Sequence, residues 1–166
     1  MPIILLNGAP GSGKTTISAL LHEKLRCLWF EFGWIPEFRH LNPHTEIPYE
    51  EEESLSFENL MLVCGNYMRH GFEHLLISDL RPELVCKAAD ALQAYHPIII
   101  TLYAEEETLR HRVLHRQNGN DYRNADEAAA INARILAAPN LPNGHRIDTT
   151  HLSAQDVCQQ ILSLLK

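Results

Sequence analysis

"NGAPGSGKTT", residues 7–16, follows directly on the apolar run "PIILL" near the start of the chain. This stretch fits the pattern G-x-x-x-x-G-K-[ST], with Gly8 first and Gly13, Lys14 and Thr15 at its end. In this pattern the glycines let backbone amides turn toward phosphate oxygens, the lysine reaches the terminal phosphates and the hydroxyl reaches Mg²⁺. A simple connecting turn is the alternative, but it has no need of Lys14 and Thr15 at those places. The stretch therefore predicts a site for ATP and Mg²⁺ formed by Gly8, Ala9, Pro10, Gly11, Ser12, Gly13, Lys14, Thr15 and Thr16.

Short apolar runs alternate with segments of helical periodicity along the rest of the chain. The runs predict strands at about 3–6, 27–32, 74–78, 97–103 and 145–148. Helices are predicted at about 14–26, from 49 onward, 82–95, 105–116, 125–138 and 153–165. Regular alternation of strand and helix indicates the α/β class, with a parallel sheet and crossover helices. No repeat or low-complexity linker interrupts it, so we expect a single domain over residues 1–166.

The amino-acid composition and net charge argue against some classes of binding partner. The chain has 166 residues, 45% hydrophobic and 21% charged, with a formal net charge of −7. This balance gives no diffuse positive field, so neither nucleic acid nor an anionic membrane is an expected partner. The first apolar run is too short for a membrane span or a signal peptide, which predicts a soluble, cytoplasmic protein. The oligomeric state is open.

The cysteines and histidines form no recognisable metal pattern. Cys27, Cys64, Cys86 and Cys158 are far apart and contain no CxxC pair, so we expect reduced, buried thiols. Among the ten histidines, some share a helical face, but no carboxylate or cysteine completes a ligand set. The acidic run 50–53 is expected to be a solvated helix start whose carboxylates face the positive end of the helix dipole.

The stretch "NGAPGSGKTTISALL" resembles the opening of the small P-loop kinases, a group that includes nucleoside monophosphate, shikimate and gluconate kinases and chloramphenicol phosphotransferase. The resemblance implies a three-layer P-loop NTPase fold with a five-stranded parallel sheet of order 2-3-1-4-5, flanked by helices. It also implies a substrate-binding segment at about 34–70 and a lid at about 117–124. The polar loop "QNGNDYRN", with its flexible Gly119, suits such a lid, although a plain surface loop would look similar.

Three acids are candidates beside the phosphates. Asp79 ends the predicted third strand, where a carboxylate can hold Mg²⁺. In this place it resembles the second acidic motif of these kinases. The alternative is that Asp79 caps the N-terminus of the helix that begins near Pro82. Glu31 lies near the end of the second strand, where several small-molecule kinases carry an aspartate that takes the acceptor's proton or helps to hold the metal; this chain has a glutamate there. Glu31, Glu37 and Asp79 are therefore candidates for the general base, in an order that the sequence leaves open.

Arginines follow in the second half of the chain. Arg112 and Arg116 are four residues apart, so both should project from one helix face next to the lid, where the resemblance implies contact with the base and the transferred phosphoryl group. Arg123 and Arg134 match the spacing of lid and helix arginines, or else pair with Asp126 or Glu127. Arg39 and Arg81 could contact an anionic acceptor. The predicted substrate-binding residues are Glu37, Arg39, Arg81, Arg123 and Arg134.

Two further regions have an expected role. The resemblance places the turn at 149–152 beside the adenine, with Thr149 and His151 as candidate contacts. Aromatic side chains around the second strand would suit a ring-bearing acceptor or equally a core: Trp29, Phe30, Phe32, Trp34, Phe38 and Tyr49. Trp29 and Phe30 should point to opposite faces of their strand.

These observations predict an enzyme that transfers the γ-phosphoryl group of ATP, with Mg²⁺, to a small-molecule acceptor: a hydroxylated metabolite, a nucleoside or nucleotide, or an antibiotic. The rival is an ATP-binding regulator or slow ATPase without an acceptor, because a phosphate loop alone does not establish transfer. A polynucleotide 5′-hydroxyl kinase would need a basic groove, which the net charge and scattered lysines disfavour.

Overall fold

The computed structural model describes residues 3–34, 47–117 and 121–165. Its centre is a sheet of five parallel strands in the order β2-β3-β1-β4-β5. The strands are β1 (Ile4–Gly8), β2 (Leu28–Glu31), β3 (Leu75–Ser78), β4 (Ile98–Tyr103) and β5 (Gly144–Asp148). The predicted α/β class and strand order are confirmed.

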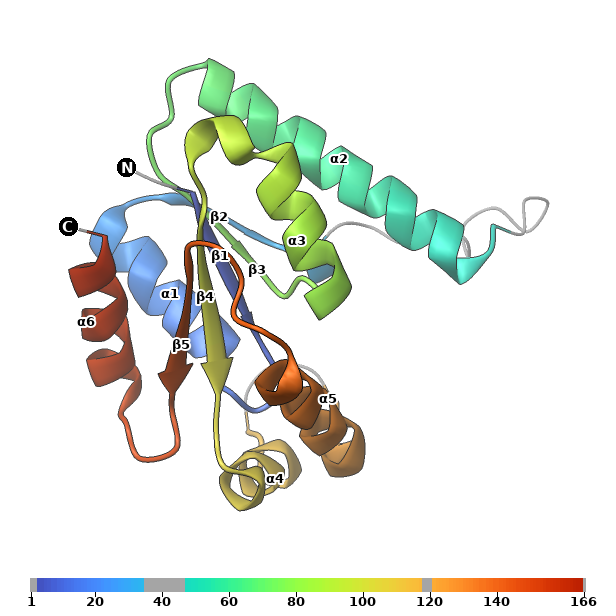
Figure 1. Ribbon diagram of the computed structural model, residues 1–166, viewed down its shortest axis with the longest axis vertical. Coiled ribbons are helices and arrows are strands. Elements are labelled where there is room, and N and C mark those ends of the chain that lie inside the picture. The colour runs from blue at the N-terminus through green and yellow to red at the C-terminus, as the bar shows by residue number, and fades with distance from the viewer. Residues whose placement is uncertain (1–2, 35–46, 118–120, 166) are drawn as a thin grey trace.

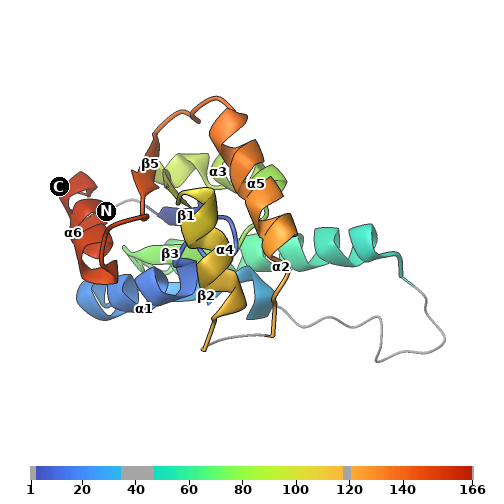
Figure 2. The same ribbon diagram turned by 90° about the horizontal axis from the view of Figure 1, so that it is seen from below.

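Helices cover both faces of the sheet and form its outer layers (Figure 1). They are α1 (Lys14–Leu25), α2 (Tyr49–Arg69), α3 (Pro82–Ala91), α4 (Glu106–Leu114), α5 (Ala125–Ala137) and α6 (Ala154–Leu164). The helices α1 and α6 pack on one face, while α2 and α3 pack on the other. Figure 2 shows α4 crossing the end of the sheet to which the strands point, with α5 beside it. None of the helices in the described ranges has both the length and the apolarity needed to cross a bilayer.

Alternation along the strands divides the core into two layers. In β1, Ile4 and Leu6 join the cluster under α1 and α6, while Leu5 joins the cluster under α2 and α3. All three are at most 3% exposed, as expected for a parallel strand covered on both sides. Trp29 packs on the first cluster and Phe30 on the second, which confirms the predicted split of these two rings.

Some helix boundaries differ from the predicted ones. The third helix ends at Ala91 rather than near residue 95, and a short 3₁₀ helix, η2 (Gln93–Tyr95), follows it. The fourth ends at Leu114, two residues before the predicted end, so Arg116 lies beyond it. Helix ends are set by packing and capping, which periodicity alone does not determine.

The expectation of four buried thiols is wrong for one of them. All four cysteines are free; Cys27, Cys64 and Cys158 are buried, but Cys86 is exposed. Cys86 belongs to α3, whose buried face is formed by Leu84, Val85 and Ala88. It therefore falls on the solvent side of an amphipathic helix.

Register brings the carboxyl ends of the strands to one edge. Glu31 of β2 is paired with Ser78 of β3, which in turn is paired with Leu6 of β1. Asp79 and Gly8 therefore follow these rows at the same edge, where β1 lies between β3 and β4. In open α/β sheets, ligands bind outside the carboxyl ends of the strands.

Candidate active site

The phosphate loop depends on glycine at both ends. A Cβ on Gly8 would lie 2.5 Å from the Leu102 carbonyl oxygen and 2.6 Å from Ser12 Oγ, so no larger residue fits against β4. Gly13 has φ 97°, a left-handed conformation that other residues rarely adopt, and it is the N-cap of α1. The loop is thus held close to the sheet and turns directly into the helix N-terminus, whose free amides and dipole attract anions.

Lys14 is the first residue of α1, and its side chain returns over the loop. Its Nζ donates to the carbonyl oxygens of Gly8, at 2.8 Å, and Ala9, at 3.3 Å. Asp79 Oδ1 lies 3.6 Å from the same nitrogen. Burial lowers the pKa of Lys14 from its ordinary value, and Asp79 partly offsets that change. The ammonium is therefore a desolvated positive charge aimed at the mouth of the loop.

Two carboxyl groups face this cation from neighbouring strands. Burial first, and then the nearby charge of Asp79, raises the pKa of Glu31 above its ordinary value. Lys14, a hydrogen bond with the Thr15 side chain and the more distant Arg116 act in the opposite direction. The structure thus joins Thr15, Glu31 and Asp79, three oxygen-bearing side chains that come from α1, β2 and the end of β3.

Asp79 has an unusual backbone conformation. Its φ of 64° is left-handed, a region that asparagine and aspartate tolerate better than most residues. The predicted alternative, a cap of the following helix, is not what the structure shows, because Arg81 is the N-cap residue of α3 and no side chain caps it. Asp79 instead contacts Lys14, in keeping with a role at the phosphates.

These groups open into one cavity of about 680 Å³. Predicted site residues that line it are Pro10, Gly11, Gly13, Lys14, Thr15, Thr16, Glu31, Asp79, Arg112 and Arg116. Gly8, Ala9 and Ser12 are buried in the loop behind this wall. Trp29 and Trp34 also line the cavity, and their rings lie 4.9 Å apart.

Gln117 and Tyr122 also line the cavity and were absent from the predicted site. Both fall within the predicted lid at 117–124, so their place in that segment was the available signal. Burial and a hydrogen bond to Glu127 raise the pKa of Tyr122 to about 12, which keeps its phenol protonated. Residues 118–120, including Gly119, lie outside the described ranges, so the lid itself remains a proposal.

Arg112 connects α4 with the turn after β5. Its guanidinium donates to Thr149 Oγ1 at 3.0 Å, to the Thr149 carbonyl at 2.7 Å and to the Thr150 carbonyl at 3.3 Å. Thr149 Oγ1 also lies 3.3 Å from the Ser12 carbonyl oxygen, so the turn is joined to the phosphate loop. Thr149 is buried, His151 is exposed, and neither lines the cavity; their contact with adenine remains a prediction.

Other predicted residues lie elsewhere or outside the described ranges. Arg123 donates to the backbone carbonyls of Tyr122 and Arg116. Arg134 projects from α5 toward α3, with Nη1 3.9 Å from Glu83 Oε1, so the structure does not bring it to the cavity. Glu37, Phe38 and Arg39 fall among residues 35–46, which the structure does not describe.

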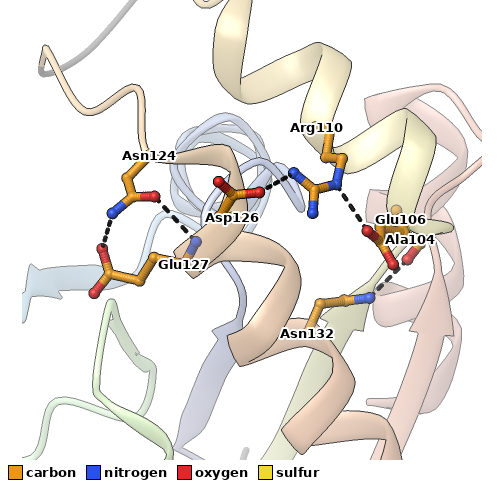
Figure 3. A network of polar contacts seen from close by, with 7 residues as sticks. All are labelled: Ala104, Glu106, Arg110, Asn124, Asp126, Glu127 and Asn132. Carbon is orange, nitrogen blue, oxygen red and sulfur yellow. Dashed lines mark hydrogen bonds and ion pairs between the residues drawn. The ribbon is translucent and has the colours of Figure 1, made fainter.

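Polar contacts hold α4, the helix that carries Arg112, against α5 (Figure 3). Arg110 donates to Glu106, at 2.7 Å, and to Asp126 on α5, at 2.6 Å. Asn132 Nδ2 donates to the Ala104 carbonyl at 2.9 Å, and Asn124 caps α5 by accepting from the Glu127 amide. These bonds hold α4 and α5 together and hold α5 against the end of β4.

The donor set at the loop suits Mg²⁺. A hydroxyl and two carboxyl groups are hard oxygen ligands, which this ion prefers together with phosphate oxygens and water. Thr15 and Asp79 both line the cavity beside the Lys14 ammonium. Within the described ranges, no group of three histidine, cysteine, aspartate or glutamate side chains is arranged to hold a metal by itself. A cation here would share its coordination with the nucleotide.

We expect Arg112→Ala to raise the KM for ATP by about tenfold, because a charged group that holds the wall of the cavity would be lost. The measurement is initial rate against ATP concentration, together with binding of a non-hydrolysable analogue. Arg110→Ala is the matched control, since Arg110 is on the same helix but bonds to Glu106 and Asp126. Equal effects of the two substitutions would assign Arg112 a purely structural role.

The chain is a P-loop protein of the small-kinase type, as its strand order, its glycine loop, the partly buried Lys14 and the acids that face it together show. Residues 4–132 match the model of the family described as "AAA domain", and the chain belongs to this family. A protein from Pyrococcus abyssi (strain GE5 / Orsay) with the name "Putative adenylate kinase" is 29% identical over 172 residues, covering 99% of this chain and 84% of that protein.

Solved structures show the same fold. A gluconokinase from Sinorhizobium meliloti 1021 superposes with a TM-score of 0.69 at 14% identity, covering 99% of this chain and 91% of the other. The tunicamycin resistance protein of Deinococcus radiodurans also gives a TM-score of 0.69, at 20% identity, with 99% and 95% coverage. At these identities the likeness concerns the fold alone.

Proposed function

We propose that the protein transfers the γ-phosphoryl group of ATP, in the presence of Mg²⁺, to a hydroxyl group of a small molecule. The observation that carries this proposal is the meeting of Lys14, Glu31 and Asp79 in one cavity next to the phosphate loop. A nucleotide-binding turn needs the lysine, but it does not need a second, partly buried carboxyl group. Glu31 therefore points to chemistry on an acceptor.

The cationic side chains would stabilise the phosphoryl group in transit. The loop amides and the N-terminus of α1 would bind the β- and γ-phosphates, with the Lys14 ammonium at their oxygens. Arg116 lines the same cavity and would add positive charge. Thr15 and Asp79 would hold Mg²⁺, which when bound neutralises charge on the phosphate oxygens.

Glu31 is our candidate for the general base. Its carboxyl group lines the cavity together with Trp34 and Asp79, and an acceptor in this cavity would approach the terminal phosphate. A base acts best when its pKa is near the working pH, and burial moves the pKa of Glu31 upward in that direction. The proton of the acceptor hydroxyl would pass to Glu31 as oxygen attacks phosphorus.

Several of the similar proteins carry the name of a kinase, but the names point to different substrates. Adenylate kinase and gluconokinase appear among them, beside a tunicamycin resistance protein. Such variety on one fold follows from changes in the segments around a common nucleotide site. The acceptor must therefore be argued from the side chains of this chain.

The test is release of ADP from ATP and Mg²⁺ in the presence of nucleosides, nucleotides, sugars, hydroxy acids and antibiotics. We expect one class of acceptor to raise ADP release and to yield a phosphorylated product detectable by mass spectrometry. Lys14→Ala, examined in parallel, separates this signal from contaminating kinases. Tight ATP binding with a flat response to every acceptor would contradict the proposal and favour a nucleotide-binding regulator.

A further inference from the structure

A second cavity lies between α3 and α5, on the face of the sheet that α3 covers. Figure 1 shows these two helices on the same side of the sheet. The cavity has a volume of about 270 Å³, and none of its described lining residues belongs to the cavity at the phosphate loop. Strand residues form its floor and apolar side chains stand around it, among them Asn7, Thr101, Arg146, Pro82, Ile135 and Leu141. The proposed phosphoryl transfer makes no use of this space.

The floor of the cavity is one row of polar side chains across three strands. Asn7 of β1 is paired with Thr101 of β4, and Thr101 is paired with Arg146 of β5. Residues that are paired in a parallel sheet project from the same face, so these three side chains lie next to one another. The preceding row on this face pairs Leu5 with Ile99, which are both buried and apolar. Packing of the sheet face alone does not account for three polar side chains in line.

Two members of this polar row have donors without a partner. Asn7 is only 5% exposed, and its Oδ1 accepts a hydrogen bond from the Gly8 amide at 2.7 Å. An N–H group needs an acceptor, so Oδ1 is directed to the loop, and Nδ2 has no hydrogen-bond partner among the described residues. The Thr101 hydroxyl likewise has none in the described part of the chain. Because an unpaired polar group away from bulk water costs free energy, the row points to a ligand oxygen in the cavity.

Arg146 gives the polar row a positive charge. Its guanidinium donates to the carbonyl oxygens of Leu136, at 3.3 Å, and Ala138, and within residues 3–34, 47–117 and 121–165 no carboxylate forms an ion pair with it. An amide NH₂, a hydroxyl group and a guanidinium in line match the oxygens of a carboxylate. The neighbouring apolar walls, which include Ile135, suit an apolar body attached to that group.

Two arginines that were predicted to contact an anionic acceptor lie outside the phosphate-loop cavity. Arg81 lines a smaller hollow at the start of α2, where its Nη1 donates to Glu53 Oε1 at 3.0 Å. Arg134 lines the present cavity. Its Nη1 lies 3.9 Å from Glu83 Oε1, which is too long for a hydrogen bond, and both side chains are more than half exposed. An ion pair of this kind is weak, so Arg134 can turn toward an anion in the cavity.

Asn7 also connects this cavity with the nucleotide site. The Gly8 amide that it binds belongs to the first residue of the phosphate loop, and the Gly8 carbonyl accepts from Lys14 Nζ at 2.8 Å. A ligand that binds Nδ2 would hold Asn7 in the orientation that fixes Gly8. Since both ligands then favour the same arrangement of the loop, each would strengthen the binding of the other.

We propose that this cavity is an effector site for a small apolar carboxylic acid. The carboxylate would bind to Asn7, Thr101 and Arg146, and the apolar body would pack against Pro82 and Ile135. Occupancy would tighten ATP binding through Asn7 and Gly8. The site is separate from the place of the phosphoryl acceptor, so it does not depend on which acceptor the protein uses.

Cys86 provides a reporter of occupancy, because it lines the cavity and is the exposed one of the four free cysteines. The rate of its alkylation by iodoacetamide is measured in the intact protein with benzoate, with hexanoate and with benzyl alcohol as the neutral control. We expect both acids to protect Cys86, with half-maximal protection below about 1 mM, and benzyl alcohol to give none. Unchanged alkylation with both acids would overturn the site, and equal protection by benzyl alcohol would overturn the recognition of a carboxylate.

Two variants place the acid on the polar row. Thr101→Val removes the hydroxyl group with little change in volume, and Arg146→Met removes the charge; each should weaken protection by benzoate about tenfold. Arg69→Met, at an exposed arginine in the last turn of α2, is the matched control. If Arg146→Met does not fold, because α5 loses its carbonyl contacts, Thr101→Val still decides the outcome. Full protection in Thr101→Val would overturn the proposed seat of the carboxylate.

The coupling is tested with a non-hydrolysable ATP analogue. Saturating benzoate should lower the Kd of the analogue about fivefold, and the analogue should lower the Kd of benzoate by the same factor. Both effects should be lost in Thr101→Val. Protection of Cys86 with no change in the affinity for the analogue would overturn the coupling through Asn7.

Discussion

Replacing Lys14 with alanine is expected to lower phosphoryl transfer by about a thousandfold or more, with the fold intact. Loss of one preorganised charge-stabilising group at a developing anion typically costs about a hundred- to a thousandfold, and a full cation at the transferred phosphates is a stronger case. The side chain lies over the loop rather than in either core cluster. Because its ammonium is buried at a cost, removal should leave the melting temperature nearly unchanged.

Single-turnover transfer and thermal unfolding of the same preparations would measure both effects. Lys24→Ala is the matched control, because Lys24 is an exposed lysine in the last turn of the same helix. Lys14→Met retains most of the stem and should be as inactive as the alanine variant, which assigns the effect to charge. Full turnover in either Lys14 variant would show that the phosphate loop does not support catalysis.

The sequence predicted best the part of the site whose shape depends on neighbouring residues in the chain, which is the phosphate loop. From Gly8 to Thr16, the loop geometry depends on neighbours in the chain, so the spacing of Gly8, Gly13 and Lys14 was sufficient. Asp79 and Glu31 were found because strand ends of a parallel sheet meet at one edge. The contacts of Asp79 with Lys14 and of Glu31 with Thr15 are seen only in the structure.

The side-chain positions that the sequence did not predict depend on how each helix is rotated about its axis. Four glutamates in succession gave no indication that Glu52 would be buried while Glu51 faces solvent, because the contacts of α2 with α3 and with a 3₁₀ helix, η1 (Phe32–Trp34), decide this. Arg134 matched a helix arginine by spacing, but its helix turns it toward Glu83. Arg112 was placed at the nucleotide, whereas its hydrogen bonds to Thr149 and Thr150 are tertiary contacts with no local signal.

Glu31→Gln is expected to lower kcat by about a hundred- to ten-thousandfold, the usual contribution of a positioned general base. Glutamine keeps the volume of the side chain and can accept the hydrogen bond that Thr15 offers, but it cannot take the acceptor's proton. Binding of ATP should change little, because the phosphates are bound by the loop and Lys14. The effect therefore belongs in kcat, measured with saturating acceptor, rather than in KM.

The pH profile identifies Glu31 more sharply than the rate alone. The acidic limb of kcat/KM reports groups of the free enzyme, and a base is active only when it is deprotonated. Burial and Asp79 raise the pKa of Glu31 above its ordinary value, so activity should fall as the pH drops through that raised pKa, before ordinary glutamates protonate. In Glu31→Gln this limb should disappear from the residual rate, whereas in the control Glu23→Gln, an exposed glutamate of α1, it should be retained. A limb that persists unchanged in Glu31→Gln would transfer the role of base to Asp79, the other carboxyl group within reach of the same phosphate.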